Sequence, residues 1–299
     1  MVAATAPAPN RVRAFLRLVM IEHSIFALPF AYVAALAAMR LDGGHVQWDT
    51  LVLVTVAMVA ARTVAMAANR IIDRRIDAQN PRTATRELVT GAVSLRTAWV
   101  GLLLSLAVFE AAAAALNPLC LLLSPVALFL LVIYSYAKRF TNYPQLFLAA
   151  AQAVAPVGAW IAVTGEWSWP AFVLGVAVGA WIGGFDCIYA CQDLEADLRI
   201  GVGSVPVRHG IRGALIISAV THVVTVALLV WFGTLADLGW LWYAGVALTT
   251  VVLVYEHAIV KPTDLSRVNR AFFTANGVIG IVLFAFALLD LVALQGLRP

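Results

Sequence analysis

The chain of 299 residues is 63% hydrophobic and only 12% charged, and its mean hydropathy is +0.91. Soluble domains carry roughly 45–50% apolar and about 25% charged residues, so this composition excludes a soluble globular enzyme, a disordered chain and a nucleic-acid-binding protein with a basic face. The net charge is only +4 at pH 7, and 3 cysteines are too few for a disulfide scaffold. The sequence therefore predicts an all-α integral membrane protein.

Nine apolar runs are long enough to cross a membrane, because a spanning helix needs about 20 mostly apolar residues. Short breaks with Gly, Pro, Asn or charged residues separate these runs, and none is long enough to divide two domains. We therefore expect one transmembrane domain over residues 1–299, preceded by a short cytoplasmic tail at 1–13. The nine predicted spans are 14–39, 48–68, 97–116, 118–136, 145–164, 170–190, 212–232, 238–259 and 271–295.

The distribution of Lys and Arg predicts how the chain is oriented. Connections on the cytoplasmic side of a membrane carry an excess of these two residues. If the N-terminus is cytoplasmic, only Arg40 and Arg298 of the 20 Lys and Arg residues fall on the other side, which leaves 18 at or near the cytoplasmic face. We therefore expect the N-terminus inside and the C-terminus outside.

Two cytoplasmic connections, at about 69–96 and 191–211, are long and contain acidic residues. In the first, Asn69, Asp73 and Asp77 follow one another at a spacing of four residues. On a helix that continues the second span, these three side chains share one face. The sequence thus predicts a line of oxygen ligands at the cytoplasmic end of the second span.

The second connection begins with a similar pattern. Asp186, Tyr189, Asp193 and Asp197 are spaced i, i+3, i+7 and i+11. A helix that extends the sixth span would therefore present all four on one face. Both acidic patterns are expected on the same side of the membrane, where they can face each other.

Two facing lines of carboxylates suit a magnesium–diphosphate site. Mg²⁺ prefers oxygen ligands and is commonly held by one or two carboxylates together with substrate phosphates. Arginines near the two patterns, among them Arg62 and Arg82, would bind the remaining phosphate oxygens. Because a carboxylate in an apolar chain is costly, we interpret these residues as a site and not as solvated loop charges.

At these residues the sequence resembles the UbiA superfamily of intramembrane aromatic prenyltransferases. The first motif of that family is met by Asn69, Asp73 and Asp77, and the second by Asp193 and Asp197. The number of predicted spans agrees as well, so the resemblance covers essentially the whole chain. It implies nine transmembrane helices that form a UbiA-type bundle around a central cavity.

The resemblance also implies the reaction. Mg²⁺ would hold a polyprenyl diphosphate between the two motifs, with the isoprenoid tail in an apolar tunnel open to lipid. Metal-assisted loss of diphosphate would leave an allylic cation, which an electron-rich aromatic ring attacks. The implied catalytic residues are Asp73, Asp77, Asp193, Asp197 and Lys138; the implied metal ligands, acting through diphosphate, are Asn69, Asp73, Asp77, Asp193 and Asp197; and the implied substrate-binding residues are Arg62, Arg82, Lys138, Arg139, Tyr189, Asp186 and Tyr134.

The segment 134–141, with the sequence YSYAKRFT, matches a tyrosine–lysine–arginine element of the family. Lys138 could contact the diphosphate or an acceptor carboxylate, and a bidentate arginine suits a carboxylate. We therefore favour Arg139 for the acceptor carboxylate. The ring faces of Tyr134 and Tyr189 could stabilise cationic charge, although Tyr134 could equally be an interfacial tyrosine.

The amino-acid sequences of both acidic segments are similar to those of bacterial family members that act on 4-hydroxybenzoate. Some of these members serve a menaquinone route with a hydroxylated naphthoate as the acceptor. The resemblance thus implies an aromatic acid acceptor, quinone biosynthesis towards ubiquinone or menaquinone, and the bacterial inner membrane. Two alternatives stay open. One is a multi-span transporter with acidic cation sites, and the other is a UbiA-like enzyme with another acceptor or a cyclase activity.

Overall fold

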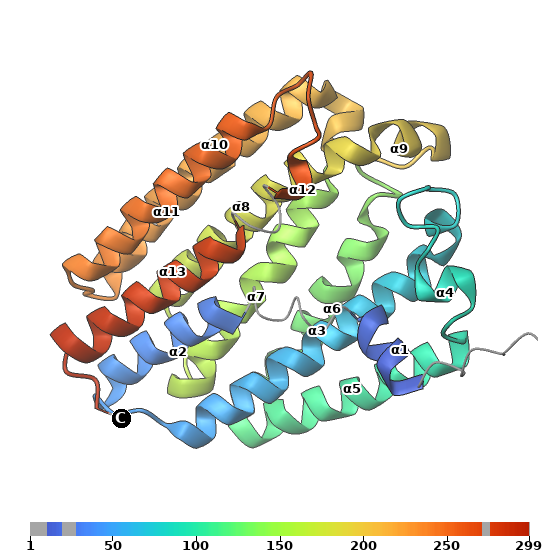
Figure 1. Ribbon diagram of the computed structural model, residues 1–299. Coiled ribbons are helices and arrows are strands. Elements are labelled where there is room, and N and C mark those ends of the chain that lie inside the picture. Colours follow the sequence, from blue (N-terminus) through green and yellow to red (C-terminus); the bar gives the residue numbers. More distant parts are fainter. Residues whose placement is uncertain (1–10, 20–27, 271–275, 299) are drawn as a thin grey trace, which may run out of the picture.

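The computed structural model describes residues 11–19, 28–270 and 276–298, and this part of the chain is helical without any β-strand (Figure 1). A 3₁₀ turn, η2, and a π-helical turn, η4, extend two of the helices. The elements are α1 (Arg11–Leu18), α2 (Leu28–Asp42), α3 (Trp48–Asp77), α4 (Glu87–Thr90), α5 (Leu95–Leu116), α6 (Pro118–Ala137), α7 (Pro144–Thr164), α8 (Trp169–Ala190), η2 (Cys191–Asp193), α9 (Leu194–Ile200), α10 (Val205–Leu235), α11 (Trp240–Ile259), α12 (Val268–Arg270), α13 (Asn276–Leu289) and η4 (Asp290–Leu294).

Eight of the nine predicted spans coincide with helices that are long and apolar enough to cross a membrane. The predicted first span, 14–39, coincides with α1 and α2, but residues 20–27 between them lie outside the described residues. Most of the predicted tail at 1–13 lies outside them as well. The described helices confirm the prediction of an all-α membrane protein.

The long helices form a closed ring. Each of them, from α3 to α13, packs against the next one along the chain, and α2 closes the ring by contacting both α13 and α3. α2 also packs against α7. Figure 1 shows the long helices running roughly parallel and antiparallel, with α4 and α9 at one end of the bundle and the C-terminus at the other.

Local sequence signals set the tight connection between α5 and α6. Asn117 lies between the two helices, and its side chain accepts a hydrogen bond from the backbone N–H of Cys120 at 2.9 Å. Pro118 occupies the first turn of α6, where no N–H is needed. The Asn117 carboxamide also donates to the carbonyl of Ile161 at 2.8 Å, so one residue caps a helix and binds α7.

Small residues let α7 and α8 pack closely. Gly175, Gly179 and Gly183 recur at every fourth position of α8, a spacing that predicts close helix packing. A Cβ atom at Gly179 would lie 2.5 Å from the carbonyl oxygen of Ala149 in α7, so no larger residue fits there. This contact confirms the predicted role of the glycines and fixes α8 against α7.

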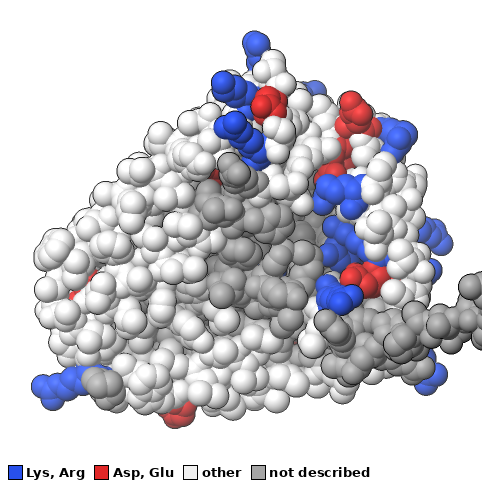
Figure 2. Space-filling view, viewed as in Figure 1, with Lys and Arg blue, Asp and Glu red and all other residues white. Residues whose placement is uncertain are grey.

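The outer surface is apolar across the middle of the bundle and charged at its ends. Large aliphatic side chains such as Leu104, Leu122 and Val223 are exposed, which suits a surface that faces lipid. Lys and Arg gather along the end that holds α4 and α9, while the face between the ends is almost free of charge (Figure 2). Arg298 pairs with the backbone of Gly44 and Val46, which places the C-terminus at the opposite end.

Candidate functional site

The two acidic motifs meet at one end of the bundle, where they line a single cavity of about 770 Å³. α3, α6, α7 and α8 provide its walls, together with the segments that follow α3 and α8. α3 runs as one helix to Asp77, as predicted, so its motif shares one face. The predicted site residues that line the cavity are Asn69, Asp73, Asp77, Arg62, Arg82, Tyr134, Lys138, Asp186, Tyr189, Asp193 and Asp197.

The second motif faces one cavity, as predicted, but a 3₁₀ turn lies within the helical segment that carries it. α8 ends at Ala190, and Asp193 ends the 3₁₀ turn that separates it from the short α9. The chain then turns back at Gly201, which has a φ of 79°. A Cβ atom at Gly203 would overlap the carbonyl oxygen of Thr141, and the Gly203 N–H donates to the carbonyl of Lys138 at 2.7 Å, so this segment packs directly on the connection after α6.

Asp73 is the most heavily paired carboxylate of the first motif. Lys138 donates to its Oδ2 at 2.6 Å, and the Asn69 carboxamide donates to the same oxygen at 3.1 Å. Nη1 of Arg139 lies 2.9 Å from Oδ1. Because the Asp73 side chain is only 3% exposed, these cations are needed to balance its charge.

Arg139 does not line the cavity, although it contacts Asp73. Its Nη1 donates to the carbonyl of Ser135 and its Nη2 to the carbonyl of Ile72, both at 2.8 Å. The N–H groups of Arg139 are therefore directed to the backbone. The guanidinium group attracts Oδ1 of Asp73 by its charge but makes no aligned hydrogen bond to this oxygen. Arg139 thus joins the C-terminal end of α6 to α3 beside the site.

Asp77, the last carboxylate of the first motif, is held by a residue of the following loop. Nη1 of Arg86 donates to its Oδ1 at 2.6 Å. The hydroxyl of Thr83 donates to the backbone carbonyl of Asp77 at 3.0 Å, which ties the loop to the end of the helix. The loop after α3 is therefore folded back over the motif that precedes it.

Asp193 connects the second motif to the same loop. Arg82 donates from Nε to Oδ1 at 2.8 Å and from Nη2 to Oδ2 at 2.5 Å, and Asn80 donates to Oδ1 at 2.9 Å. The Arg82 guanidinium also lies over the ring of Tyr189, 5.0 Å from its centroid. Burial lowers the pKa of Arg82, but its hydrogen bond and charge attraction to Asp193 outweigh burial and raise the pKa above its ordinary value.

Asp186 lies deeper in the cavity, on α8. The carboxamide of Gln145 in α7 donates to its Oδ2 at 3.2 Å. Asp197, on α9, lines the outer part of the same cavity. Carboxylates from α3, α8, the turn η2 and α9 are therefore directed into one space.

The residues fit magnesium bound together with a phosphate group, and not a metal held by protein alone. Within the described ranges, no three carboxylate, imidazole or thiolate side chains are close enough to hold a metal ion. Carboxylate and carboxamide oxygens instead line two walls of one cavity, next to Lys138, Arg82 and Arg86. Mg²⁺ is typically bound by such a set when substrate phosphates complete its coordination.

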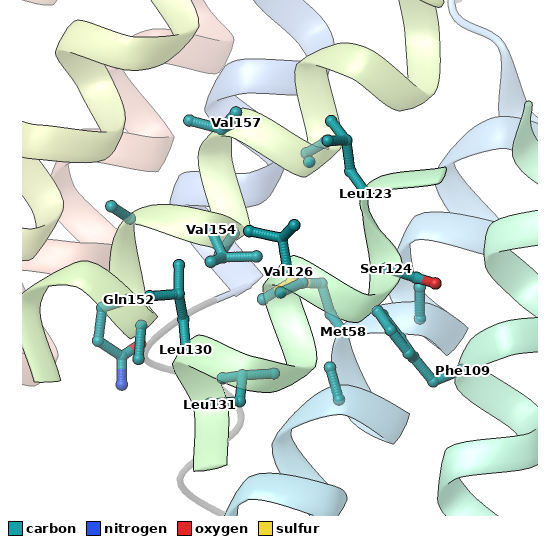
Figure 3. A pocket seen from close by; sticks show the side chains of 18 of the residues that line it. Met58, Phe109, Leu123, Ser124, Val126, Leu130, Leu131, Gln152, Val154 and Val157 are labelled. Carbon is teal, nitrogen blue, oxygen red and sulfur yellow. The ribbon is translucent and has the colours of Figure 1, made fainter. Parts of the chain in front are cut away.

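A second cavity, of about 530 Å³, extends from the first towards the middle of the bundle. Its walls come from α3, α5, α6, α7 and α8 and are almost entirely apolar. Figure 3 shows this lining, in which Gln152 and Ser124 carry the polar groups among labelled side chains such as Leu130 and Val154. The two cavities share four lining residues, Arg62, Met66, Tyr134 and Gln152, and so adjoin each other.

Sequence reasoning did not assign Asn80, Arg86, Gln145 or Gln152 to the site. Asn80 and Arg86 belong to the loop after α3, whose many arginines signalled a basic segment but not which carboxylate each one contacts. Gln145 and Gln152 lie on α7, in an otherwise apolar span. A polar residue in such a span, twice on one helical face, is the signal that could have indicated them.

Comparison with known proteins identifies relatives of the whole chain. Residues 27–278 match the UbiA prenyltransferase family. The 4-hydroxybenzoate octaprenyltransferase of Vibrio campbellii is 30% identical over 275 residues, which cover 92% of this chain and 96% of the relative. The enzyme of the same name from Nitrosospira multiformis is 35% identical over 245 residues, covering 81% of this chain and 83% of the relative.

Solved structures share the helix arrangement. The apo structure of a UbiA homolog from Aeropyrum pernix K1 superposes with a TM-score of 0.82 at 37% identity, covering 90% of this chain and 98% of that one. A UbiA homolog from Archaeoglobus fulgidus, bound to DMAPP and Mg²⁺, gives a TM-score of 0.71 at 21% identity over 94% and 99% of the two chains. The ring of helices described above is therefore the fold of these proteins.

Proposed function

The chain belongs to the UbiA prenyltransferase family, and we propose that it transfers a polyprenyl group from a polyprenyl diphosphate to an aromatic carboxylic acid, with Mg²⁺ as cofactor. The observation that carries this proposal is that the polar and apolar cavities adjoin and share lining residues. A polar end for a diphosphate and an apolar extension for its tail are the two parts that this class of substrate requires.

The polar cavity supplies what a metal-bound diphosphate needs. Asn69 and the four motif aspartates, Asp73, Asp77, Asp193 and Asp197, would bind Mg²⁺ through their oxygens. When bound, Mg²⁺ supplies positive charge that stabilises the diphosphate as it leaves. The homolog from Archaeoglobus fulgidus is described as bound to DMAPP and Mg²⁺, which supports this assignment by analogy of fold.

Cations of the cavity would exchange partners when substrate binds. Lys138, Arg82 and Arg86 each contact a motif aspartate. A diphosphate offers these cations oxygens of higher negative charge, and the aspartates are then free to bind the metal. We therefore assign Lys138, Arg82 and Arg86 to the diphosphate.

The apolar cavity would hold the isoprenoid tail. Its lining lacks hydrogen-bonding groups apart from a few residues, and a prenyl chain needs none. The dry lining also keeps water away from an allylic cation, which water would otherwise capture. The reactive carbon C1, which joins diphosphate and tail, then lies at the junction of the two cavities.

The acceptor must also reach that junction, and Arg62 is placed there to bind its carboxylate. Arg62 lines both cavities, and its Nε makes no hydrogen bond to any residue that the structure describes. Arg139, which the sequence favoured for this role, donates to two backbone carbonyls instead. We therefore assign the carboxylate to Arg62, and Arg139 to the positioning of Asp73.

The proposed reaction is an electrophilic aromatic substitution. The C1–O bond of the prenyl diphosphate breaks with both electrons on the leaving diphosphate, and a ring carbon forms a bond to C1 with a π-electron pair. That ring carbon then loses its proton to the diphosphate or to water, and aromaticity returns. The ring faces of Tyr134 and Tyr189, which line the cavity, would stabilise the allylic cation.

The names of the relatives favour 4-hydroxybenzoate as the acceptor, because both bacterial enzymes described above act on it by name. A hydroxynaphthoate has the same pair of groups, a carboxylate and a hydroxyl on an aromatic ring. Either acceptor places the reaction in quinone biosynthesis. The distribution of Lys and Arg further supports an active site at the cytoplasmic face of a bacterial inner membrane, with the C-terminus outside.

The test is prenylation by the purified protein in nanodiscs with Mg²⁺ and a polyprenyl diphosphate. 4-Hydroxybenzoate and 1,4-dihydroxy-2-naphthoate are supplied separately, and the variants Asp73→Ala and Asp193→Ala are measured beside the wild type. A prenylated acid that both variants and EDTA abolish is the expected result. Diphosphate release without a prenylated acid would indicate a cyclase or another acceptor, and no turnover of diphosphate would contradict the proposal.

A further inference from the structure

Gln152 is a polar residue with spare hydrogen-bonding capacity in an apolar wall. Its side chain lines both cavities (Figure 3). The carboxamide makes no hydrogen bond to any residue that the structure describes, whereas Gln145, two turns earlier on α7, is bonded to Asp186. A carboxamide offers two donors and an acceptor, and leaving them unsatisfied within a membrane protein is costly. The Gln152 carboxamide is therefore available to a polar group that enters the cavity.

Gln152 of α7 and Arg62 of α3 both line the junction of the two cavities. Arg62 precedes Asn69 by seven residues on α3, and Gln152 follows Gln145 by seven residues on α7. Seven residues of an α-helix span roughly 10 Å. Both residues line the polar and the apolar cavity, so Arg62 and Gln152 lie at the junction of the two, beyond the aspartates.

The two residues differ in the chemistry that they can bind. The Arg62 guanidinium suits an anionic group, whereas the Gln152 carboxamide is neutral and suits a group that can both donate and accept, such as a hydroxyl. The isoprenoid tail has no such group, and the diphosphate lies among the aspartates. The remaining candidate is the acceptor, which carries a carboxylate and a hydroxyl on one ring.

We infer that the Gln152 carboxamide hydrogen-bonds the ring hydroxyl of the acceptor and thereby selects hydroxylated aromatic acids. This inference rests on the proposed function and names the residue that sets its acceptor specificity. With the carboxylate on Arg62 and the hydroxyl on Gln152, the ring is fixed at two points. The carbon next to the hydroxyl, which the hydroxyl activates, then faces C1 of the prenyl group.

The hydrogen bond also assists the reaction. As the ring attacks C1, positive charge spreads onto the hydroxyl oxygen and its O–H becomes a stronger donor. An O–H bond directed to the Gln152 carbonyl is then stronger in the transition state than in the ground state, which accelerates the step. Loss of Gln152 should therefore lower kcat as well as acceptor affinity.

The test compares two ligands that differ only at the hydroxyl. Dissociation constants are measured by calorimetry for 4-hydroxybenzoate and 4-methylbenzoate, in nanodiscs that contain Mg²⁺ and geranyl thiolodiphosphate, an unreactive analogue. For the wild type, we expect 4-hydroxybenzoate to bind roughly tenfold more tightly. For Gln152→Met, which keeps the length of the side chain but removes its hydrogen bonds, the two dissociation constants should become equal.

Met66→Leu is the matched control, because Met66 lines the same junction without a strong hydrogen-bonding group. It should change both dissociation constants by the same factor and preserve their ratio. A tenfold ratio that persists in Gln152→Met would overturn the inference. If the wild type neither binds nor prenylates 4-hydroxybenzoate, the proposed function fails instead, and the two failures are thereby distinguished.

Unchanged binding of 4-methylbenzoate by Gln152→Met shows that the variant is folded. If that variant binds neither acid nor the thiolodiphosphate, Gln152→Leu takes its place. If both variants fail to fold, the test uses the dissociation constants of the wild type alone. Equal constants for the two acids would overturn the inference. A preference for 4-hydroxybenzoate that disappears when its hydroxyl is methylated would support it.

Discussion

Arg82 and Asp193, which are 111 residues apart in the sequence, are joined by two hydrogen bonds of 2.8 and 2.5 Å. This bidentate pair connects the loop after α3 to the turn after α8, and so brings the two acidic motifs to one cavity. Planar, two-point pairing of this kind requires the guanidinium group. The relationship gives Arg82 a role in assembling the site as well as in binding phosphate.

Replacement of Arg82 by lysine should weaken binding of the prenyl diphosphate. Lysine retains the charge but cannot make the paired hydrogen bonds to Asp193 or, by our proposal, to a phosphate. We expect the KM for the diphosphate to rise about tenfold, corresponding to about 1.4 kcal/mol, while the KM for the acceptor stays within twofold. Steady-state kinetics in nanodiscs measure both, with Arg208→Lys, an exposed arginine, as the control. An equal rise in both KM values would argue against this role.

Neutralisation of Asp73 or Asp77 should abolish most of the activity. Asp73→Asn and Asp77→Asn preserve size but remove the charge that would bind Mg²⁺, so we expect kcat/KM to fall at least about 100-fold. Asp264→Asn serves as the control, because Asp264 is exposed and its carboxylate accepts a hydrogen bond from the backbone N–H of the neighbouring Ser266, away from the site. Retention of more than a tenth of the wild-type activity by Asp73→Asn would remove this residue from the proposed metal site.

The long helices of the fold could be predicted from the sequence because apolar runs and helical spacing are local signals. The continuation of α3 to Asp77 follows from the four-residue spacing of Asn69, Asp73 and Asp77. For Asp186, Tyr189, Asp193 and Asp197 the spacing also predicts the shared face, since all four line one cavity, but not the 3₁₀ turn at Cys191–Asp193 within the helix. Helical spacing predicts which residues can share a face, but it does not show where an α-helix changes to a 3₁₀ turn.

The partners of the site residues could not be predicted in the same way. The pairing of Arg86 with Asp77 and of Asn80 with Asp193 depends on how a loop folds back over the bundle. Several arginines of that loop have equivalent charge in the sequence, so charge alone does not distinguish them. Gln152 was missed for a different reason: it is one polar residue in an apolar span, and its meaning depends on the junction of two cavities.

Magnesium and diphosphate should bind together and not separately. No three candidate metal-binding side chains converge on one point in the described part of the chain, so a diphosphate must complete the metal's coordination. We expect Mg²⁺ at 1 mM or geranyl thiolodiphosphate alone to shift the melting temperature by less than about 2 °C, and both together to raise it by more than about 5 °C. EDTA should remove the combined shift and the activity. A full shift with Mg²⁺ alone would show a metal site formed by the protein itself.

Gly179→Val should destabilise the fold by disrupting the contact between α7 and α8. A Cβ atom at Gly179 would lie 2.5 Å from the carbonyl oxygen of Ala149, and the backbone cannot move away without separating two helices. We expect a loss of about 1–3 kcal/mol, as for other overpacked positions. Thermal unfolding in detergent measures it. Gly158→Val, at a helical position with open space around its Cβ, is the control and should lose less. Equal losses would show that close packing at Gly179 is not the cause.

Gly158→Phe should shorten the isoprenoid tail that the enzyme accepts. Gly158 lines the apolar cavity, no atom lies within 4 Å of its Cβ position, and it lies six residues beyond Gln152 on α7, roughly 9 Å deeper. A phenyl ring there would fill the space that a long tail needs but leave the junction open. We expect kcat/KM for octaprenyl diphosphate to fall at least about tenfold, while that for geranyl diphosphate changes less than about threefold. Ala115→Phe, at an exposed position of α5 outside both cavities, controls for the added ring. If both substrates lose activity equally, the tail does not follow this cavity past Gly158.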